Sequence, residues 1–215
     1  PVNIVIGERS EGKTYYFKRR GIRNFLNKGQ TWVYCRRYNN TLKAMLDRHD
    51  FFGDIKRNNE FPGVEFRVDG RTMQLRQEGE KAWRTFGFFT ALSQAQTYKG
   101  TTDATCTMLV YDEFINELRT PGYLPNEPTL LMNYWETLDR REDRVKIFMD
   151  FKRPGHHNVD RKMSIQRIRK TIHRNRRSGS EICYIAFGMN TGIRTSTAGH
   201  MNTVSHHHGH SLFDG

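Results

Sequence analysis

The fold is decided near the N-terminus by the stretch Asn3-Ile4-Val5-Ile6-Gly7-Glu8-Arg9-Ser10-Glu11-Gly12-Lys13-Thr14, an apolar strand that runs into a Gly-x-x-x-x-Gly-Lys-Thr loop. The two glycines let backbone N–H groups approach phosphate oxygens, Lys13 supplies a positive charge, and the Thr14 hydroxyl is a magnesium ligand. Four constrained positions favour this reading over a plain glycine turn at a helix start. We therefore expect a phosphate-binding site formed by Gly7, Arg9, Gly12, Lys13 and Thr14.

A second apolar run, Cys106 to Phe114, carries the adjacent carboxylates Asp112 and Glu113 near its end. It is short enough for a buried parallel strand, and we expect it to lie beside the first strand, so that both carboxyl ends face one crevice. Asp112 would then reach the magnesium ion. Glu113 would orient or deprotonate an attacking water, which indicates hydrolysis rather than transfer to a substrate hydroxyl. Taken alone, the pair also fits an acidic strand end beside a helix N-terminus.

The composition favours a polyanionic partner. The 215 residues hold 35 Lys and Arg against 23 Asp and Glu, a net charge of +12, and nucleic acid is the first candidate. No apolar run is long enough to span a membrane, and no secretion signal opens the chain, so we expect a soluble intracellular protein. Three unclustered cysteines, Cys35, Cys106 and Cys183, lie in apolar runs and are expected to be buried thiols rather than zinc ligands or disulfides.

Strands and helices alternate as far as residue 151, which predicts an α/β domain with a mainly parallel sheet flanked by helices. Asp69-Gly70 between two alternating runs predicts a β-hairpin. The expected helices are 15–27, 41–52 and 127–138, and the expected strands after the first are 31–35, 64–68, 72–76, 83–92, 106–114 and 144–151.

The chain changes character after residue 151. We expect a basic linker or helix over 152–180, because residues 161–177 hold eight Lys and Arg and no acidic residue. This segment fits either a solvated charged face or a contact with a phosphate backbone. Residues 181–188 are a strand candidate within a tail, 181–215, whose His206, His207, His208 and His210 fit either a divalent-metal site or an affinity-tag-like end.

Six blocks in order carry a family resemblance. They are the phosphate loop, Val33 to Tyr38, Leu92-Ser93 with Lys99, Val110 to Ile115, Leu124 to Glu127, and Leu138 to Val145. In these blocks the chain resembles the DNA-packaging ATPase of small podophages of the phi-twenty-nine-like type, over about residues 2–147. The resemblance implies a P-loop NTPase fold of the additional-strand (ASCE) type over residues 1–151, with ATP and Mg²⁺ as cofactors.

The resemblance also implies partners and a place of action. A ring of ATPases, five in number, would pump double-stranded DNA into an empty prohead through the portal, with a prohead RNA as scaffold. The protein would act in the host cytoplasm, docked transiently on the prohead.

Two further residues receive roles through the resemblance alone. Arg140 corresponds to an arginine finger donated to the neighbouring subunit's ATP, and Lys99 to a basic residue that assists in trans or in subunit coordination. A finger supplies positive charge to the transferring phosphoryl group and makes hydrolysis depend on the neighbour. The simpler alternatives are a solvated charge at a helix end for Arg140 and a surface loop residue for Lys99.

The chain departs from the family pattern at two places. Asp150 stands on the strand where the family has a polar sensor of the γ-phosphate, so the sensing role is open. A complete motor also carries a nuclease-like domain, of which residues 181–215 would be at most a vestigial fragment, and we expect no nuclease activity.

The sequence therefore predicts an ATP-driven translocase of double-stranded DNA in a viral packaging motor, with Glu113, Arg140 and Lys99 as catalytic residues and Thr14 and Asp112 on the metal. A helicase-like or genome-segregation motor and a nucleic-acid-binding assembly module with a static ATP clamp are the alternatives. All three predict salt-sensitive DNA binding, so basicity does not separate them.

Overall fold

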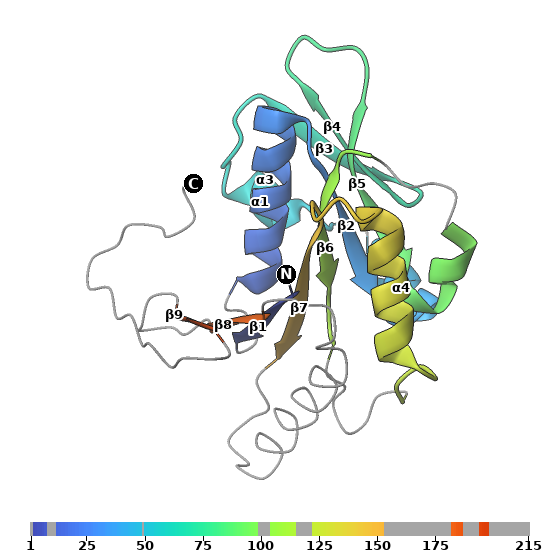
Figure 1. The fold of residues 1–215 in the computed structure, drawn as a ribbon. Coiled ribbons are helices and arrows are strands. Elements are labelled where there is room, and N and C mark those ends of the chain that lie inside the picture. The colour runs from blue at the N-terminus through green and yellow to red at the C-terminus, as the bar shows by residue number, and fades with distance from the viewer. Residues whose placement is uncertain are drawn as a thin grey trace.

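The computed structural model describes residues 2–7, 12–48, 50–98, 104–114, 122–152, 182–186 and 194–197. Within these ranges the strands form one sheet of nine in the order β3-β4-β5-β2-β6-β7-β1-β8-β9 (Figure 1). Their bounds are β1 Val2–Gly7, β2 Thr31–Arg36, β3 Val64–Asp69, β4 Thr72–Gln77, β5 Arg84–Ala91, β6 Cys106–Tyr111, β7 Lys146–Lys152, β8 Ile182–Ala186 and β9 Arg194–Thr197.

The centre of the sheet is parallel, as the alternation of strands and helices predicts. Every neighbouring pair from β5 through β2, β6, β7 and β1 to β8 runs parallel. Antiparallel pairs occur only toward the two edges of the described sheet: the predicted hairpin β3–β4 with β5, and β8 with β9. The expectation that β1 and β6 are neighbours is wrong, because β7 pairs with both and lies between them.

Helices cover both faces of the sheet, with α1 and α4 on opposite sides (Figure 1). The helices are α1 Lys13–Lys28, α2 Asn39–Leu46, α3 Gly53–Arg57, the 3₁₀ helix η1 Leu92–Tyr98, and α4 Glu127–Asp139. Two of the predicted helices, 15–27 and 127–138, are confirmed with small changes of boundary. The predicted helix 41–52 is confirmed only as far as Leu46, where α2 ends. The chain turns at Phe51 and Phe52 and buries both rings among other aromatic side chains, and α3 begins beyond the predicted range, at Gly53.

The alternation of side chains along the central strands divides the core in two. On the face of α1, Trp32 and Tyr34 of β2 pack with Val110 and Phe148. On the face of α4, the intervening β2 residues Val33 and Cys35 join a cluster that contains Leu109, Tyr111, Ile147 and Met149. Residues that follow these strands therefore alternate between the two faces as well. This alternation decides which side chains meet at the site.

Two of the three cysteines are described as side chains, and both Cys35 and Cys106 are buried free thiols, as expected. Burial raises the pKa of the Cys35 thiol far above its usual range. Among the described helices, none has the length and apolar character needed to cross a membrane. The basic segment 161–177, the histidine cluster and residues 99–103, which include Lys99, lie outside the described residues.

Candidate nucleotide-binding site

The phosphate loop leads from the end of β1 at Gly7 to the start of α1 at Lys13. Gly12 has a left-handed φ of 78°, which a glycine adopts at little cost, and its carbonyl accepts the Tyr16 amide at 2.8 Å. The first turn of α1 contains no acidic residue, so the positive end of the helix and Lys13 together favour an anion there. Arg9 lies outside the described residues, together with the rest of the loop between Gly7 and Gly12.

Asp112 follows β6 on the face of the sheet that carries α1. Its Oδ2 accepts hydrogen bonds from the Tyr34 hydroxyl and, at 2.9 Å, from Arg36 Nη2, while its Oδ1 accepts the Glu113 amide at 3.0 Å. Its own amide donates to the Cys35 carbonyl at 2.9 Å, which joins the ends of β2 and β6. Burial, followed by the charge of Asp112, raises the pKa of Tyr34 well above its usual range, so this hydroxyl stays a donor.

Asp150 on β7 lies between Val5 of β1 and the end of β6 that leads to Asp112, because β7 separates β1 from β6. It is 4% exposed, and within the described structure its Oδ1 has no hydrogen-bond partner. Burial and the Asp112 carboxylate raise the pKa of Asp150 to about 8, although Lys13 acts in the opposite direction. Lys13, Asp112 and Asp150 thus lie close enough together for their charges to affect one another.

This donor set fits a magnesium ion. The buried carboxyl groups of Asp112 and Asp150 lie close together, and Asp150 Oδ1 has no hydrogen-bond partner within the described structure, so the two residues provide the hard oxygen ligands that Mg²⁺ prefers. Within the described residues, no group of three or more His, Cys, Asp or Glu side chains forms a protein-only metal site. That also suits Mg²⁺, which is usually held by one or two carboxylates together with substrate phosphates and water.

Glu113 adopts an unusual backbone conformation directly after Asp112. Its φ is 57°, in the left-handed region that residues other than glycine rarely occupy. Its side chain is partly exposed, and its Oε1 lies 3.7 Å from Arg36 Nη2. The predicted pair of carboxylates is therefore present, with Asp112 buried and Glu113 open to the solvent side.

Arg37 and Glu127 form a buried ion pair for which the sequence predicted no role. Arg37 Nε lies 2.6 Å from Glu127 Oε2, and their side chains are 6% and 4% exposed. Because Arg36 faces α1, its neighbour Arg37 faces α4, where Glu127 occupies the first helical position. Two adjacent arginines directly after an apolar strand were the available signal. Their partners lie 76 to 90 residues away in the sequence.

Arg140 lies far from these carboxylates within its own chain. It caps the C-terminus of α4, whereas the N-terminus of that helix contacts Arg37 and Tyr111 at the carboxyl end of β6. A helix of 13 residues is about 20 Å long at the usual rise. Arg140 and Glu113 are therefore at opposite ends of α4. Lys99 lies outside the described residues.

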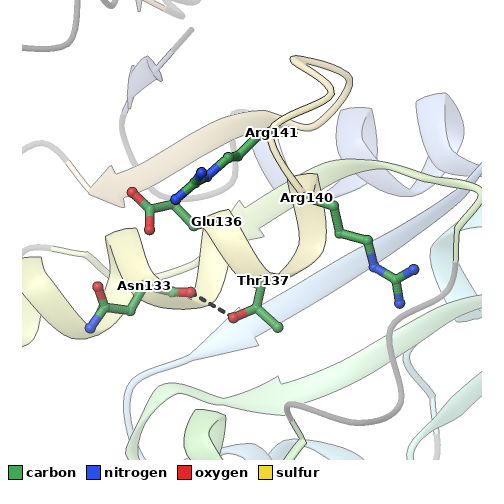
Figure 2. A pocket seen from close by; sticks show the side chains of 5 residues that line it. All are labelled: Asn133, Glu136, Thr137, Arg140 and Arg141. Carbon is green, nitrogen blue, oxygen red and sulfur yellow. Dashed lines mark hydrogen bonds between the residues drawn. The ribbon is translucent and has the colours of Figure 1, made fainter.

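The turn that carries Arg140 is tightly built. Arg140, Arg141 and Asp143 all have left-handed φ values of 51–63°. The buried Asp139 carboxylate holds the turn by accepting the amides of Asp143 at 3.1 Å and of Arg144 and Val145 at 2.8 Å. Figure 2 shows Arg140 extending away from Arg141, beside a polar surface pocket of about 380 Å³ that is also lined by Asn133, Glu136 and Thr137.

The family model of the podovirus DNA encapsidation protein (Gp16) matches residues 1–151. The chain belongs to this family. A DNA packaging protein of Bacillus phage B103 is 36% identical over 142 residues, which cover 66% of this chain and 41% of that protein. The Gp16-family chain thus spans less than half the length of that relative.

Solved structures agree with the family assignment. The N-terminal domain of the DNA packaging ATPase from bacteriophage phi29 has a TM-score of 0.59 and 28% identity, and the match covers 76% of this chain and 79% of that chain. A chain of the phi29 viral genome packaging motor assembly has a TM-score of 0.58 and 29% identity, and the match covers 76% and 47% of the two chains. The resemblance predicted from the six blocks is therefore confirmed as membership of the Gp16 family.

Proposed function

We propose that this chain is the ATPase part of a viral packaging motor and hydrolyses ATP to translocate double-stranded DNA into a prohead. One observation carries the proposal: the start of α1, Asp112 and Asp150 converge at the carboxyl ends of β1, β6 and β7 in a Gp16-family chain. Ligands of open α/β sheets bind in that position. The name of the phi29 domain, a DNA packaging ATPase, supports the same chemistry for this chain.

The binding roles follow from the residue types. Gly7, Arg9 and Gly12 belong to the loop that would wrap the phosphates, and Lys13 would neutralise their charge. Thr14 and Asp112 would hold Mg²⁺. Asp150 interacts electrostatically with Asp112, so its protonation state would alter the affinity of this site for the ion. Magnesium, when bound, neutralises the charge that develops on the transferring phosphoryl group.

Glu113 would orient and deprotonate the attacking water. Its carboxylate is partly exposed at the edge of the site, while the neighbouring Asp112 is held by Tyr34 and Arg36. A base beside an ordered metal ligand is the usual arrangement for hydrolysis, because geometry contributes more than the basicity of the carboxylate.

Arg140 would act as an arginine finger on the neighbouring subunit. The separation of Arg140 from Glu113 by the length of α4 supports action between subunits, since it places Arg140 away from the Asp112 and Glu113 carboxylates of its own chain. The rigid turn held by Asp139 would present the side chain in a constant direction. Lys99 would assist at the same interface.

The position of β7 supports the additional-strand class of P-loop ATPases, in which a strand separates the phosphate-loop strand from the acidic strand. We assign the ATPase domain to residues 1–151, a basic linker or helix to 152–180, and a tail to 181–215. The parallel pairing of β8 with β1 favours a tail that extends the ATPase sheet over a fragment of a nuclease-like domain.

The partners are proposed from the family. Double-stranded DNA, a homo-oligomeric ring of five subunits, the portal and a prohead RNA would complete the motor, which would assemble on the prohead in the host cytoplasm. The similarity to a chain of the phi29 motor assembly supports an oligomeric motor of this type.

Steady-state ATP hydrolysis tests the proposal, measured with and without double-stranded DNA across protein concentrations that span assembly. Wild type should show DNA-stimulated turnover that rises steeply with concentration, Glu113→Gln should bind ATP but hydrolyse it poorly, and Arg140→Ala should lose the stimulated turnover. Arg141→Ala is the matched control, because this arginine lies on the same turn and extends in another direction (Figure 2).

Mixing the two inactive variants tests action between subunits. Rings that contain both Glu113→Gln and Arg140→Ala subunits hold some interfaces with an intact Glu113 and an intact Arg140, so part of the activity should return. Tight ATP binding without turnover in wild type would indicate a static assembly module instead. Unwinding of a forked duplex would indicate a helicase.

A further inference from the structure

The segment Asp112–Phe114 needs an external support, because Glu113 holds a left-handed φ of 57°. Residues other than glycine keep this conformation only where the surroundings enforce it, and such residues concentrate at functional sites. The Glu113 amide binds Asp112 Oδ1 at 3.0 Å, and the Phe114 amide binds the Asp150 carbonyl at 3.0 Å. These bonds fix the N–H groups of Glu113 and Phe114. The carbonyl groups of the same two residues are fixed by a different side chain.

That side chain is Arg37. Its Nη1 donates to the Glu113 carbonyl at 3.1 Å, and its Nη2 donates to the Phe114 carbonyl at 2.5 Å. One rigid planar group thus binds two consecutive carbonyls, and a single-point cation such as lysine cannot reproduce this fork. The contact reaches Glu113 from the α4 face of the sheet, whereas Arg36 reaches the carboxylates from the α1 face.

Glu127 in turn fixes the guanidinium. Its Oε2 accepts Arg37 Nε at 2.6 Å and its Oε1 accepts Nη2 at 2.9 Å, a two-point ion pair. The same carboxylate accepts the Tyr111 hydroxyl at 2.8 Å and the Leu124 amide at 2.9 Å. The rings of Tyr111 and Tyr123 lie 5.8 and 4.8 Å from the guanidinium carbon. The Tyr111 hydroxyl and the Leu124 amide therefore hold the Glu127 carboxylate in place against the Arg37 guanidinium.

A purely stabilising role explains this arrangement poorly. Burying a charged pair costs desolvation energy that apolar residues of equal size would avoid, so such pairs are weak sources of stability. A buried pair does impose a defined geometry, and here the geometry is imposed on the main chain of Glu113, the proposed base.

We propose that Arg37 and Glu127 are positioning residues for hydrolysis, which set the direction of the Glu113 carboxylate by holding its main chain. This inference rests on the proposed role of Glu113 as the base that activates water. Neither residue contacts the nucleotide in this scheme, so their loss should lower kcat and leave the KM for ATP nearly unchanged.

The test compares the wild-type chain with Arg37→Lys, Glu113→Gln and the Arg37→Lys/Glu113→Gln double variant in ATP hydrolysis. Arg37→Lys should lower kcat by about tenfold to a hundredfold, the range expected when a catalytic group is misplaced by an ångström or less. In the Glu113→Gln background the same change should have no further effect, because Arg37 acts through Glu113. A merely structural role would reduce activity in both backgrounds.

Hydrogen exchange supplies a readout that does not depend on turnover. Arg37→Lys should raise the exchange of the peptide that covers Asp112–Phe114. Arg37→Gln/Glu127→Gln, which removes both buried charges, should fold and show the same two effects if Arg37→Lys is too unstable to purify. Lys18→Gln is the control, since the buried Lys18 of α1 pairs with the partly exposed Asp54 of α3 rather than with Glu113. It should leave kcat and this exchange unchanged.

The outcomes separate the two proposals. If Glu113→Gln is inactive but Arg37→Lys keeps wild-type kcat and exchange, the positioning role is wrong and the proposed function stands. If Glu113→Gln hydrolyses ATP as fast as wild type, the proposed base is wrong and the positioning role falls with it.

Discussion

Gly21→Ala should destabilise the fold although alanine is the better helix former. Gly21 lies inside α1, and a Cβ there would stand 2.4 Å from Nε1 and 2.6 Å from Cε2 of Trp32. The indole is 1% exposed and has no room to move away from α1, because Gly87 of β5 lies against its other side. A Cβ at Gly87 would stand 2.9 Å from the same Nε1 atom. The ring is therefore confined between a helix and a strand.

The two opposing effects can be compared in magnitude. Replacing an interior helical glycine by alanine gains about 1 kcal/mol of helix propensity. Overpacking a close-packed core costs about 1–3 kcal/mol, and contacts this short with a rigid ring place the cost at the upper end of that range. The net loss should be about 1–2 kcal/mol, which lowers Tm by roughly 2–8 °C in a chain of this size.

Urea unfolding followed by circular dichroism measures the change, in the wild-type and Trp32→Leu backgrounds. Leucine removes the ring atoms that Cβ would meet, so in that background Gly21→Ala should be neutral or stabilising by up to about 1 kcal/mol. Equal destabilisation in both backgrounds, or a gain of stability in wild type, would refute the packing argument.

Two further predictions concern the carboxylates around the site. Asp139→Asn should cost about 1–3 kcal/mol and lower Arg140-dependent turnover, because an amide cannot accept all three N–H groups of the turn; unchanged Tm and turnover would contradict this. In the folded protein the pKa of Asp150 is about 8, whereas an Asp in the unfolded chain has a pKa of about 4. The folded state therefore binds this proton more tightly, and in EDTA the free energy of unfolding of wild type should fall as the pH rises from about 4 to about 8. Asp150→Asn should remove this part of the slope in urea titrations at pH 5 and pH 8, and an unaltered slope would show that the raised pKa does not occur.

Structural features that depend on residues close together in the sequence were predictable from the sequence. The apolar run and glycine spacing before Lys13 define a strand, a loop and a helix start, and the Asp69-Gly70 hairpin follows from a turn between two alternating runs. The carboxylates after β6 were identifiable because a buried parallel strand reads as an apolar run that ends abruptly in charge. Each of these signals is contained in fewer than about fifteen residues.

Tertiary structure alone decided how these local elements form a site. The local sequence patterns do not specify that β7 inserts between β1 and β6, because strand order depends on pairings between segments more than 30 residues apart; only the family resemblance pointed to an additional strand. This order places Asp150 beside Asp112. Long-range packing also explains why Arg36 pairs with Asp112 whereas Arg37 pairs with Glu127. The pleat turns adjacent side chains to opposite faces, and only the packing of α4 brings Glu127, 90 residues away, to Arg37. The sequence by itself therefore determined the phosphate loop and the acidic strand, while the long-range packing of strands and helices determined which charges meet around them.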